Sequence, residues 1–340
     1  MRIGENMREI IISECVNLLN NYNFTVSQSF SRSCFDILAR KKDLKFLIKV
    51  LKNIDSLSTE QSKELMKISA ILDAIPLLIG VRTRNFPMEN DVVYERHGIK
   101  AITYDTFKLY LEGSPPVVYA RRGGFFVNID GNALRSIREK LNISIGELAE
   151  YSNVSRKAIY KYEQNMANPS IEVALKIEQY LDVPLVKGID LMPDELKERN
   201  SVKLLQKEQE GESSTNIDCE NEFKLQVITM LNELGFNMIE TKKAPFDAVA
   251  EKYEEHSHNY EEEFYNTNTL LLTNIDEVET EETRKKAMVL NQISNILNSY
   301  SLVILEKNTK NMRHITTISL KELEKMDDAF DLLTYLINKN

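Results

Sequence analysis

The feature that most restricts the fold of this chain lies between residues 134 and 181, where apolar side chains recur at helical spacing in short pieces. Residues three and four positions apart lie on one face of a helix. Helices of this length are marginal alone and become stable only when their apolar faces pack together. The stretch therefore predicts a small all-α domain. Its buried faces are expected to be Leu134, Ile137 and Leu141 in the first helix, Leu148 and Ala149 in the second, and Ile159 and Tyr162 in the third.

The connections between these pieces carry residues typical of helix ends. Ser144 and Ser155 come directly before the second and third helices, where a hydroxyl oxygen can accept a hydrogen bond from a free backbone N–H. Asn153 occupies a turn position where a left-handed backbone is usual, and Asn tolerates that conformation better than most residues. Pro169 is expected to start a fourth helix, which Asn168 caps.

This order of helices and turns resembles the Cro and phage-repressor class of helix-turn-helix domains. The residues that carry the resemblance are Glu147-Leu148-Ala149, Asn153-Val154-Ser155, Ile159, Tyr162-Glu163 and Pro169. Two positions depart from the class: Ile145 stands where a phosphate-contacting Gln is usual, and Asn165 stands where Gly is usual. The resemblance implies a buried core that consists of Leu148, Ala149, Val154, Ile159 and Tyr162.

In this class the third helix, here residues 155–164, places its first turn in the major groove of DNA. Arg156 and Lys157 lie in that turn, and both side chains can donate to guanine O6 and N7, so we expect them at or beside base edges. The residues expected to contact double-stranded DNA are Ser155, Arg156, Lys157, Tyr160, Lys161 and Asn168, the last through phosphate. The alternatives are a helical bundle with a merely solvated polar face and a protein-binding module.

The residues before this block follow an α/β pattern, from residue 1 to about residue 113. Ser114-Pro115-Pro116 then begins a connection that extends to residue 131. Residues 132–190 hold the helix-turn-helix domain, and residues 191–216 form a charged linker, helical or flexible. In the first two segments we predict helices at 6–20, 58–73 and 103–111, a hairpin at 35–40 and 44–51, a buried strand at 75–81, and short strands at 117–120 and 125–129.

The last segment, residues 217–340, follows the same order of patterns as the first. In both, a helix and an aromatic turn precede a Phe-Asp pair, an Asn-Ile-Asp triplet, a second helix and a buried strand. The second copy also has an acidic insertion, Glu254–Glu263. We interpret the match as a structural repeat, with chance similarity of two α/β segments as the alternative. The matching positions are 35–39 with 246–250, 53–55 with 274–276, and 76–79 with 302–305.

The expected fold class is therefore α+β and multidomain, with a central all-α domain between two α/β domains. The α/β pattern resembles the restriction-endonuclease-like fold, whose nucleases use two acidic residues and a Lys to hold a divalent metal and the attacking water. Asp36 and Lys49 match that set, but Leu47 stands at the second acidic position. The second copy keeps Asp247 and has Leu270 in place of the Lys. We expect no enzyme activity, no metal and no cofactor.

The net charge of −9 is unusual for a DNA-binding protein, but it is unevenly distributed. Residues 1–119 carry +2, residues 120–190 carry +1 and residues 191–340 carry −12. The proposed DNA-binding domain is thus not acidic, and attraction to phosphate depends on the local face rather than on the chain total. We expect its non-specific affinity for DNA to be modest.

Other classes of protein have little support in the sequence. No apolar run approaches the ~20 residues of a membrane span, and the N-terminus lacks the pattern of a signal peptide, so we expect a cytoplasmic protein. The three cysteines, Cys15, Cys34 and Cys219, are far apart and are expected to be reduced. The four histidines show no zinc-binding spacing.

The layout as a whole resembles a family of archaeal helix-turn-helix transcriptional regulatory proteins, most specifically across residues 121–184, which include Arg122–Gly131. The resemblance implies a sequence-specific DNA-binding transcription regulator, and we expect it to act as a homodimer on a palindrome because one such unit buries little DNA surface. The alternatives are a nucleic-acid-processing enzyme targeted by the helix-turn-helix and an adaptor for protein or a small ligand. The sequence identifies no target gene or effector.

Overall fold

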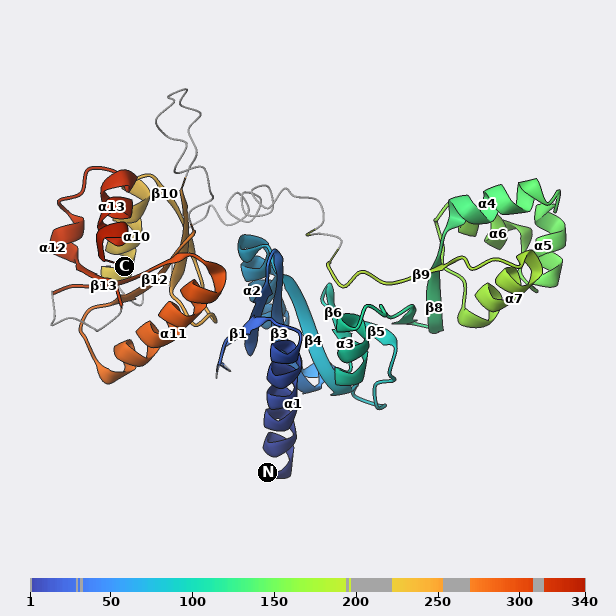
Figure 1. The fold of residues 1–340 in the computed structure, drawn as a ribbon, viewed down its shortest axis with the longest axis horizontal. Coiled ribbons are helices and arrows are strands. Elements are labelled where there is room, and N and C mark those ends of the chain that lie inside the picture. Colours follow the sequence, from blue (N-terminus) through green and yellow to red (C-terminus); the bar gives the residue numbers. More distant parts are fainter. Residues whose placement is uncertain are drawn as a thin grey trace, which may run out of the picture. The chain divides into compact units, whose positions relative to one another are not determined.

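The computed structural model describes residues 2–28, 30, 33–193, 196, 222–252, 270–307 and 315–339 (Figure 1). Most of the predicted linker 191–216, the acidic insertion 254–263 and Cys219 lie outside the described residues. The chain divides into two compact units that do not follow chain order. One consists of residues 1–22, 48–62 and 75–199, and the other of residues 23–47, 63–74 and 200–340.

The predicted elements of the first α/β segment are present, with small changes at their ends. They are α1 (Arg2–Asn21), β1 (Thr25–Val26), β2 (Ile37–Lys41), β3 (Leu44–Asn53), α2 (Thr59–Leu72), β4 (Ile75–Arg82), β5 (Val92–Arg96), β6 (Ile99–Ile102) and α3 (Tyr104–Leu111). Ser58 accepts a hydrogen bond from the Gln61 N–H at 3.1 Å, and Thr103 caps α3. Both caps agree with the helix starts expected from the sequence.

The hairpin of β5 and β6 has no counterpart among the predicted elements. Its two-residue turn, His97-Gly98, has positive φ at both positions, 51° and 78°. This conformation matches the twist of the strands on either side. His is an uncommon residue there, whereas Gly98 adopts the angle without strain. The turn is therefore a weaker signal in sequence than an Asn-Gly pair would be.

The strands of the N-terminal part form one sheet in the order β1-β2-β3-β4-β6-β5-β7-β8-β9. Two strands of the predicted connection, β7 (Val118–Arg121) and β8 (Gly124–Ile129), extend it, and β9 (Val186–Lys187) ends it. β7 pairs with β5 in parallel and with β8 in a hairpin, while β8 pairs with β9 antiparallel. The connection is therefore an extension of the sheet that leads directly into the helical block.

The C-terminal segment has its own five-stranded sheet in the order β10-β11-β12-β13-β14. The first two pairs are antiparallel and the last two are parallel. Its elements are α10 (Glu222–Glu233), β10 (Phe236–Glu240), β11 (Ala248–Lys252), β12 (Leu270–Asp276), α11 (Glu281–Leu297), β13 (Tyr300–Leu305), β14 (Thr317–Ser319), α12 (Leu320–Leu323) and α13 (Ala329–Lys339).

Up to their last strand, both α/β segments follow one element order: a helix, three strands, a helix and two strands, with β5 as an insertion in the first. One helix, α3, then follows in the first segment, and two, α12 and α13, follow in the second. The registers also correct the alignment of the two segments. Ile79 pairs with Ile102, and Ile304 pairs with Ile318, in each case directly before the residue that caps the next helix. Residues 76–79 therefore correspond to 301–304, one residue earlier than the sequence pairing with 302–305.

Within the second unit, parts of the first segment are hydrogen-bonded to the C-terminal segment. The Lys67 ammonium donates to the Glu240 carbonyl at 2.9 Å, and the Glu64 carboxylate accepts from the Lys242 N–H at 2.8 Å. The Cys34 N–H donates to the Lys243 carbonyl at 2.7 Å. Two of these bonds involve Lys242 and Lys243, which lie in the loop before Phe246-Asp247, and one of those two also involves Cys34, directly before Phe35-Asp36. In the part of the chain that the structure describes, no helix is long and apolar enough to cross a membrane.

Candidate nucleic-acid interface

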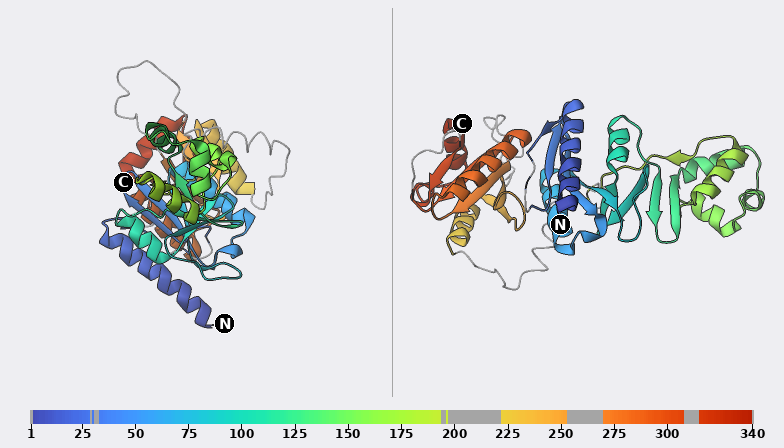
Figure 2. Two further views of the ribbon diagram at one scale, coloured as in Figure 1. Left: turned by 90° about the vertical axis from the view of Figure 1, so that its right-hand side faces the viewer. Right: turned by 90° about the horizontal axis from the view of Figure 1, so that it is seen from below.

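The helical block consists of four short helices, which form the cluster of green helices in both views of Figure 2. They are α4 (Gly131–Lys140), α5 (Ile145–Tyr151), α6 (Arg156–Glu163) and α7 (Ile171–Leu181). The predicted core is largely correct: Leu148, Ala149, Ile159 and Tyr162 are buried in one cluster, against which the half-buried Val154 packs. Leu141, in contrast, is 49% exposed because α4 ends one residue before it.

The hydroxyl caps predicted for α5 and α6 are confirmed. Ser144 accepts a hydrogen bond from the Glu147 N–H, and Ser155 accepts one from the Ala158 N–H, both at 3.1 Å. Asn153 has φ 57°, as expected for the turn between these helices. Because Ser155 fixes where α6 starts, it also fixes which side chains point outward from its first turn.

The predicted cap of the fourth helix is wrong. Ser170, not Asn168, caps α7, because Pro169 lies before the helix and its carbonyl accepts a hydrogen bond from the Val127 N–H. The Asn168 amide instead donates to Asn128 Oδ1 at 2.7 Å. A side-chain amide carries two hydrogens, so this bond orients Asn168 and leaves one hydrogen for another acceptor.

The outward face of α6 is formed by residues that the sequence assigned to DNA contact. Arg156, Lys157, Tyr160 and Lys161 are all exposed, and Tyr160 is 51% exposed. The Arg156 guanidinium lies over Gly146 in the first turn of α5, where a Cβ on Gly146 would lie 3.0 Å from it. The first turns of both helices therefore lie side by side: that of α6 presents Arg156 and Lys157, and that of α5 presents the exposed Glu147.

The two positions that depart from the repressor class have local explanations. Ile145, at the usual Gln position, is half-buried and packs against the core of the block. Asn165 has φ 54° and its side-chain oxygen accepts a hydrogen bond from the Gly131 N–H at 3.0 Å. Asn165 thus adopts the left-handed turn for which Gly is usual and also joins the end of α6 to the start of α4.

A buried ion pair that is not among the predicted features holds α4 against α6. The Arg138 guanidinium donates to both carboxylate oxygens of Glu163, at 2.5 and 3.1 Å, and to the Ile143 carbonyl at 2.9 Å. The bonds to Glu163 hold the pKa of Arg138 above its usual value. Each residue follows a buried apolar residue by four positions, Leu134 and Ile159, so helical spacing puts each beside a buried position but does not show that the two form a pair.

Gly131, the first residue of α4, packs against the last turn of α6. A Cβ at this position would lie 2.3 Å from the Tyr162 carbonyl oxygen and 2.8 Å from the Glu163 carbonyl oxygen. These atoms belong to the backbone and cannot move aside independently. The position therefore requires glycine.

We expect Gly131→Ala to destabilise the helical block by about 1–3 kcal/mol, since overpacking at a close helix contact forces backbone shifts. Amide hydrogen exchange of the full chain, followed over α4 and α6, measures this loss. Asn132→Ala, at the next and exposed position of α4, is the matched control and should change protection little. Unchanged protection in Gly131→Ala would contradict the expected clash.

The two ends of the helical block are joined by strands. Asn128 pairs with Lys187 and Ile129 with Val186, and the Asp130 N–H donates to the Leu185 carbonyl at 2.9 Å. Lys187 also lies 2.7 Å from the Asp130 carboxylate, and its hydrogen bond is the main cause of the lowered pKa of Asp130. The two ends of the helical block are therefore attached to the sheet through β8 and β9, not through a free linker.

The nuclease-like positions of the first segment lie in the core. Asp36, Leu47 and Lys49 are each buried, and Leu47 is completely so. In the C-terminal segment, Asp247 Oδ2 accepts from the Ile275 N–H at 3.0 Å, which is a structural role. Leu270 is half-buried. The described residues include no group of three or more His, Cys, Asp or Glu that could hold a metal ion.

Comparisons with family models match two parts of the chain. Residues 8–116 match the model described as a PD-(D/E)XK superfamily domain, and residues 134–187 match the model described as helix-turn-helix. The first match agrees with the α/β topology and the second with α4–α7. Together they show a mixed α+β protein with a PD-(D/E)XK-like domain and a helix-turn-helix domain.

Several archaeal proteins are similar along almost their whole length, and each is provisionally named "HTH-type transcriptional regulatory protein". One from Methanococcus maripaludis is 55% identical over 98% of both chains. One from Methanocaldococcus jannaschii is 52% identical over 97% of this chain and 96% of its own. One from Pyrococcus horikoshii is 35% identical over 96% of both chains.

Proposed function

Because this chain belongs to the family of HTH-type transcriptional regulatory proteins found across archaea, we propose that it regulates transcription by reading a specific DNA sequence with α6. The helix-turn-helix domain and the names of the relatives support a DNA-binding regulator. The observation that carries the proposal further is the geometry of α6: its start is capped by Ser155 and its outward face presents Arg156, Lys157 and Tyr160.

Each side chain on this face has a chemical role at DNA. Arg156 and Lys157 reach base edges, where guanine O6 and N7 accept hydrogen bonds. Tyr160 and Lys161, further along the helix, contact phosphate or the sugar edge. The Ser155 hydroxyl accepts from Ala158 and still has its own hydrogen to donate to phosphate. The second amide hydrogen of Asn168 is placed to do the same from the turn before α7.

We further propose that the protein acts as a homodimer on a palindrome. One α6 reads few base pairs, and two units related by a two-fold axis read two half-sites about one helical turn apart. The α/β segments, which we take to be two copies of one structural repeat, provide the scaffold for pairing or for sensing an effector. Their shared element order supports the repeat.

Selection of bound genomic fragments by the full chain at physiological salt tests both proposals. We expect the recovered fragments to share an inverted repeat with half-site centres about 10–10.5 bp apart or a multiple of that. Sedimentation of the protein with one such fragment should give two chains per duplex. Fragments without any shared sequence would contradict sequence-specific reading, and one chain per duplex would contradict the homodimer.

We propose that the PD-(D/E)XK-like domain has no nuclease activity, because Leu47 occupies a position that requires a carboxylate. The full chain should leave plasmid and linear duplex DNA uncut in the presence of Mg²⁺ or Mn²⁺. Cleavage that disappears in Asp36→Ala would support the nucleic-acid-processing alternative instead. Cleavage that persists in Asp36→Ala would indicate a contaminating nuclease, which repeated purification of that variant would remove.

A further inference from the structure

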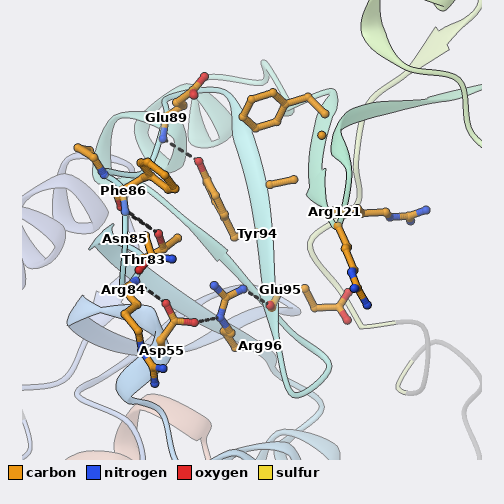
Figure 3. A pocket seen from close by; sticks show the side chains of 15 residues that line it. Asp55, Thr83, Arg84, Asn85, Phe86, Glu89, Tyr94, Glu95, Arg96 and Arg121 are labelled. Carbon is orange, nitrogen blue, oxygen red and sulfur yellow. Dashed lines mark hydrogen bonds and ion pairs between the residues drawn. The ribbon is translucent and has the colours of Figure 1, made fainter.

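A groove of about 960 Å³ lies between the β4–β5 loop and the turn of the β7–β8 hairpin, all within one compact unit (Figure 3). Four arginines line it: Arg84, Arg96, Arg121 and Arg122. Phe86, Tyr94 and Phe125 also line it, as do the acidic residues Asp55, Glu89 and Glu95. No part of the groove belongs to the α6 surface, so the proposed DNA-reading function does not account for it.

Three of the four arginines are available to a ligand. Arg96 donates to the Asp55 carboxylate at 2.6 Å, and this bond lowers the pKa of Asp55. Arg84, Arg121 and Arg122 are exposed and form no ion pair with any described residue. Arg121 stacks on the Tyr119 ring, 4.9 Å from its centroid, which holds the guanidinium in place without neutralising it. The groove therefore offers cationic donors that suit an anion with several oxygens.

The loop that presents Phe86 is firmly held. The Thr83 N–H donates to the Phe86 carbonyl at 2.8 Å, and the Thr83 hydroxyl accepts from the Phe86 N–H at 3.1 Å. The Arg84 N–H donates to Asp55 at 2.5 Å, and Tyr94 accepts from the Glu89 N–H at 3.0 Å. Despite this order, the Phe86 ring is 71% exposed at the rim of the groove. An exposed aromatic ring on a hydrogen-bonded loop is a stacking surface for a planar ligand.

Arg121 and Arg122 are placed by a turn that requires glycine. Gly123 and Gly124 have φ of 101° and 135°, which side chains adopt only with strain, and nothing surrounds the positions where Cβ atoms would lie. Backbone conformation and not crowding therefore selects glycine here. The turn sends β8 directly into α4, so a ligand that bridges the β4–β5 loop and this turn contacts the strand that carries the helix-turn-helix block.

We propose that this groove binds a nucleotide, with the phosphates on Arg84, Arg121 and Arg122 and the base stacked on Phe86. Its volume lies within the range of small-molecule sites, about 300–1,000 Å³. Phosphate alone would use the arginines but neither the exposed ring nor the polar groups of Asn85, Glu89 and Glu95, which can bond the hydroxyls of a sugar and the edge of a base. A nucleotide uses the arginines through its phosphates, the ring through its base, and the polar groups through its sugar and the edge of its base.

Calorimetric titration of the full chain without DNA tests the site, with ATP, GTP, CTP and UTP as probes and tripolyphosphate as the probe that lacks base and sugar. We expect saturable binding of at least one nucleotide, and at least about 10-fold weaker binding of tripolyphosphate. The double variant Arg121→Ala/Arg122→Ala and the single variant Phe86→Ala should each weaken nucleotide binding about 10-fold or more. Phe86→Ala should leave tripolyphosphate binding unchanged.

A double variant that removes two other cations, Lys108→Ala/Lys176→Ala, is the matched control and should bind as the wild type does. The proposal is overturned if none of the four nucleotides binds saturably, or if Arg121→Ala/Arg122→Ala binds them unchanged. It is also overturned if tripolyphosphate binds as tightly as the nucleotides, or if a short duplex without the selected site competes with them for the groove. Because no step uses the α6 surface, these outcomes are independent of the proposed DNA reading.

Discussion

A chain with Arg156→Ala and Lys157→Ala is expected to lose at least about 30-fold in affinity for its selected DNA site. Each base contact of this kind contributes about 1–3 kcal/mol of discrimination. Both side chains are exposed in the first turn of α6, where their removal leaves the core and the Ser155 cap untouched. The loss should therefore appear in binding and not in the thermal stability of the chain.

Titration of a labelled fragment at several salt concentrations measures the effect and separates two roles. If Lys157 contacts phosphate, Lys157→Ala reduces the slope of log K against log salt by about 1, whereas loss of a base contact relaxes sequence preference. Lys140→Ala/Lys176→Ala removes two cations elsewhere in the same block and should bind nearly as the wild type does. Equal binding by the α6 variant and the wild type would contradict the proposed reading helix.

Glu163→Ala is expected to destabilise the helix-turn-helix block by about 3–5 kcal/mol, because it leaves the Arg138 guanidinium buried without its partner. The Glu163 side chain is only 2% exposed and that of Arg138 only 9% exposed, so water cannot replace the lost carboxylate. The ion pair joins α4 to α6. Its loss should loosen the end of the reading helix, and DNA affinity should fall with stability.

Hydrogen exchange of the full chain, resolved over α4, α6 and the C-terminal sheet, measures this change. The loss of protection should be confined to the helical block. Arg138→Met/Glu163→Leu, which removes both charges, should recover much of the protection since no charge remains buried. Glu172→Ala removes the exposed partner of Lys176 on α7 and should change little. Wild-type protection in Glu163→Ala would show that the pair contributes nothing to the block.

How much of this molecule can be predicted from sequence depends on the range of the interactions concerned. The caps Ser144 and Ser155 and the left-handed Asn153 act within a few residues, so a linear pattern identified each of them. The sequence pattern does not identify Ser170 as the cap of α7, because Pro169 is itself a common first residue of a helix. In the fold its carbonyl is engaged by β8 instead, which a local pattern does not show.

The residues of the candidate site also differ in the range of the interactions that define them. Helical periodicity places Arg156, Lys157 and Tyr160 on one outward face, because a cap fixes the start of the helix and 3.6 residues per turn fixes the rest. The Arg138–Glu163 pair and the contact of Gly131 with α6 involve residues 25 or more positions apart. Whether a charged residue in an amphipathic helix faces water or a partner depends on the crossing of two helices, which spacing alone does not determine.

Hydrophobic periodicity and helix caps are local properties, so the amino-acid sequence alone predicts a four-helix unit of the helix-turn-helix type between two α/β segments of similar order. Three features follow only from the folded chain: the connection is part of the sheet, β8 and β9 hold the two ends of the helical block, and four arginines line one groove. The sequence predicts β7 and β8 as short strands but does not show what they pair with, and β9 has only two residues, too few for a recognisable pattern. Their pairing depends on backbone hydrogen bonds between residues as far apart as Asn128 and Lys187.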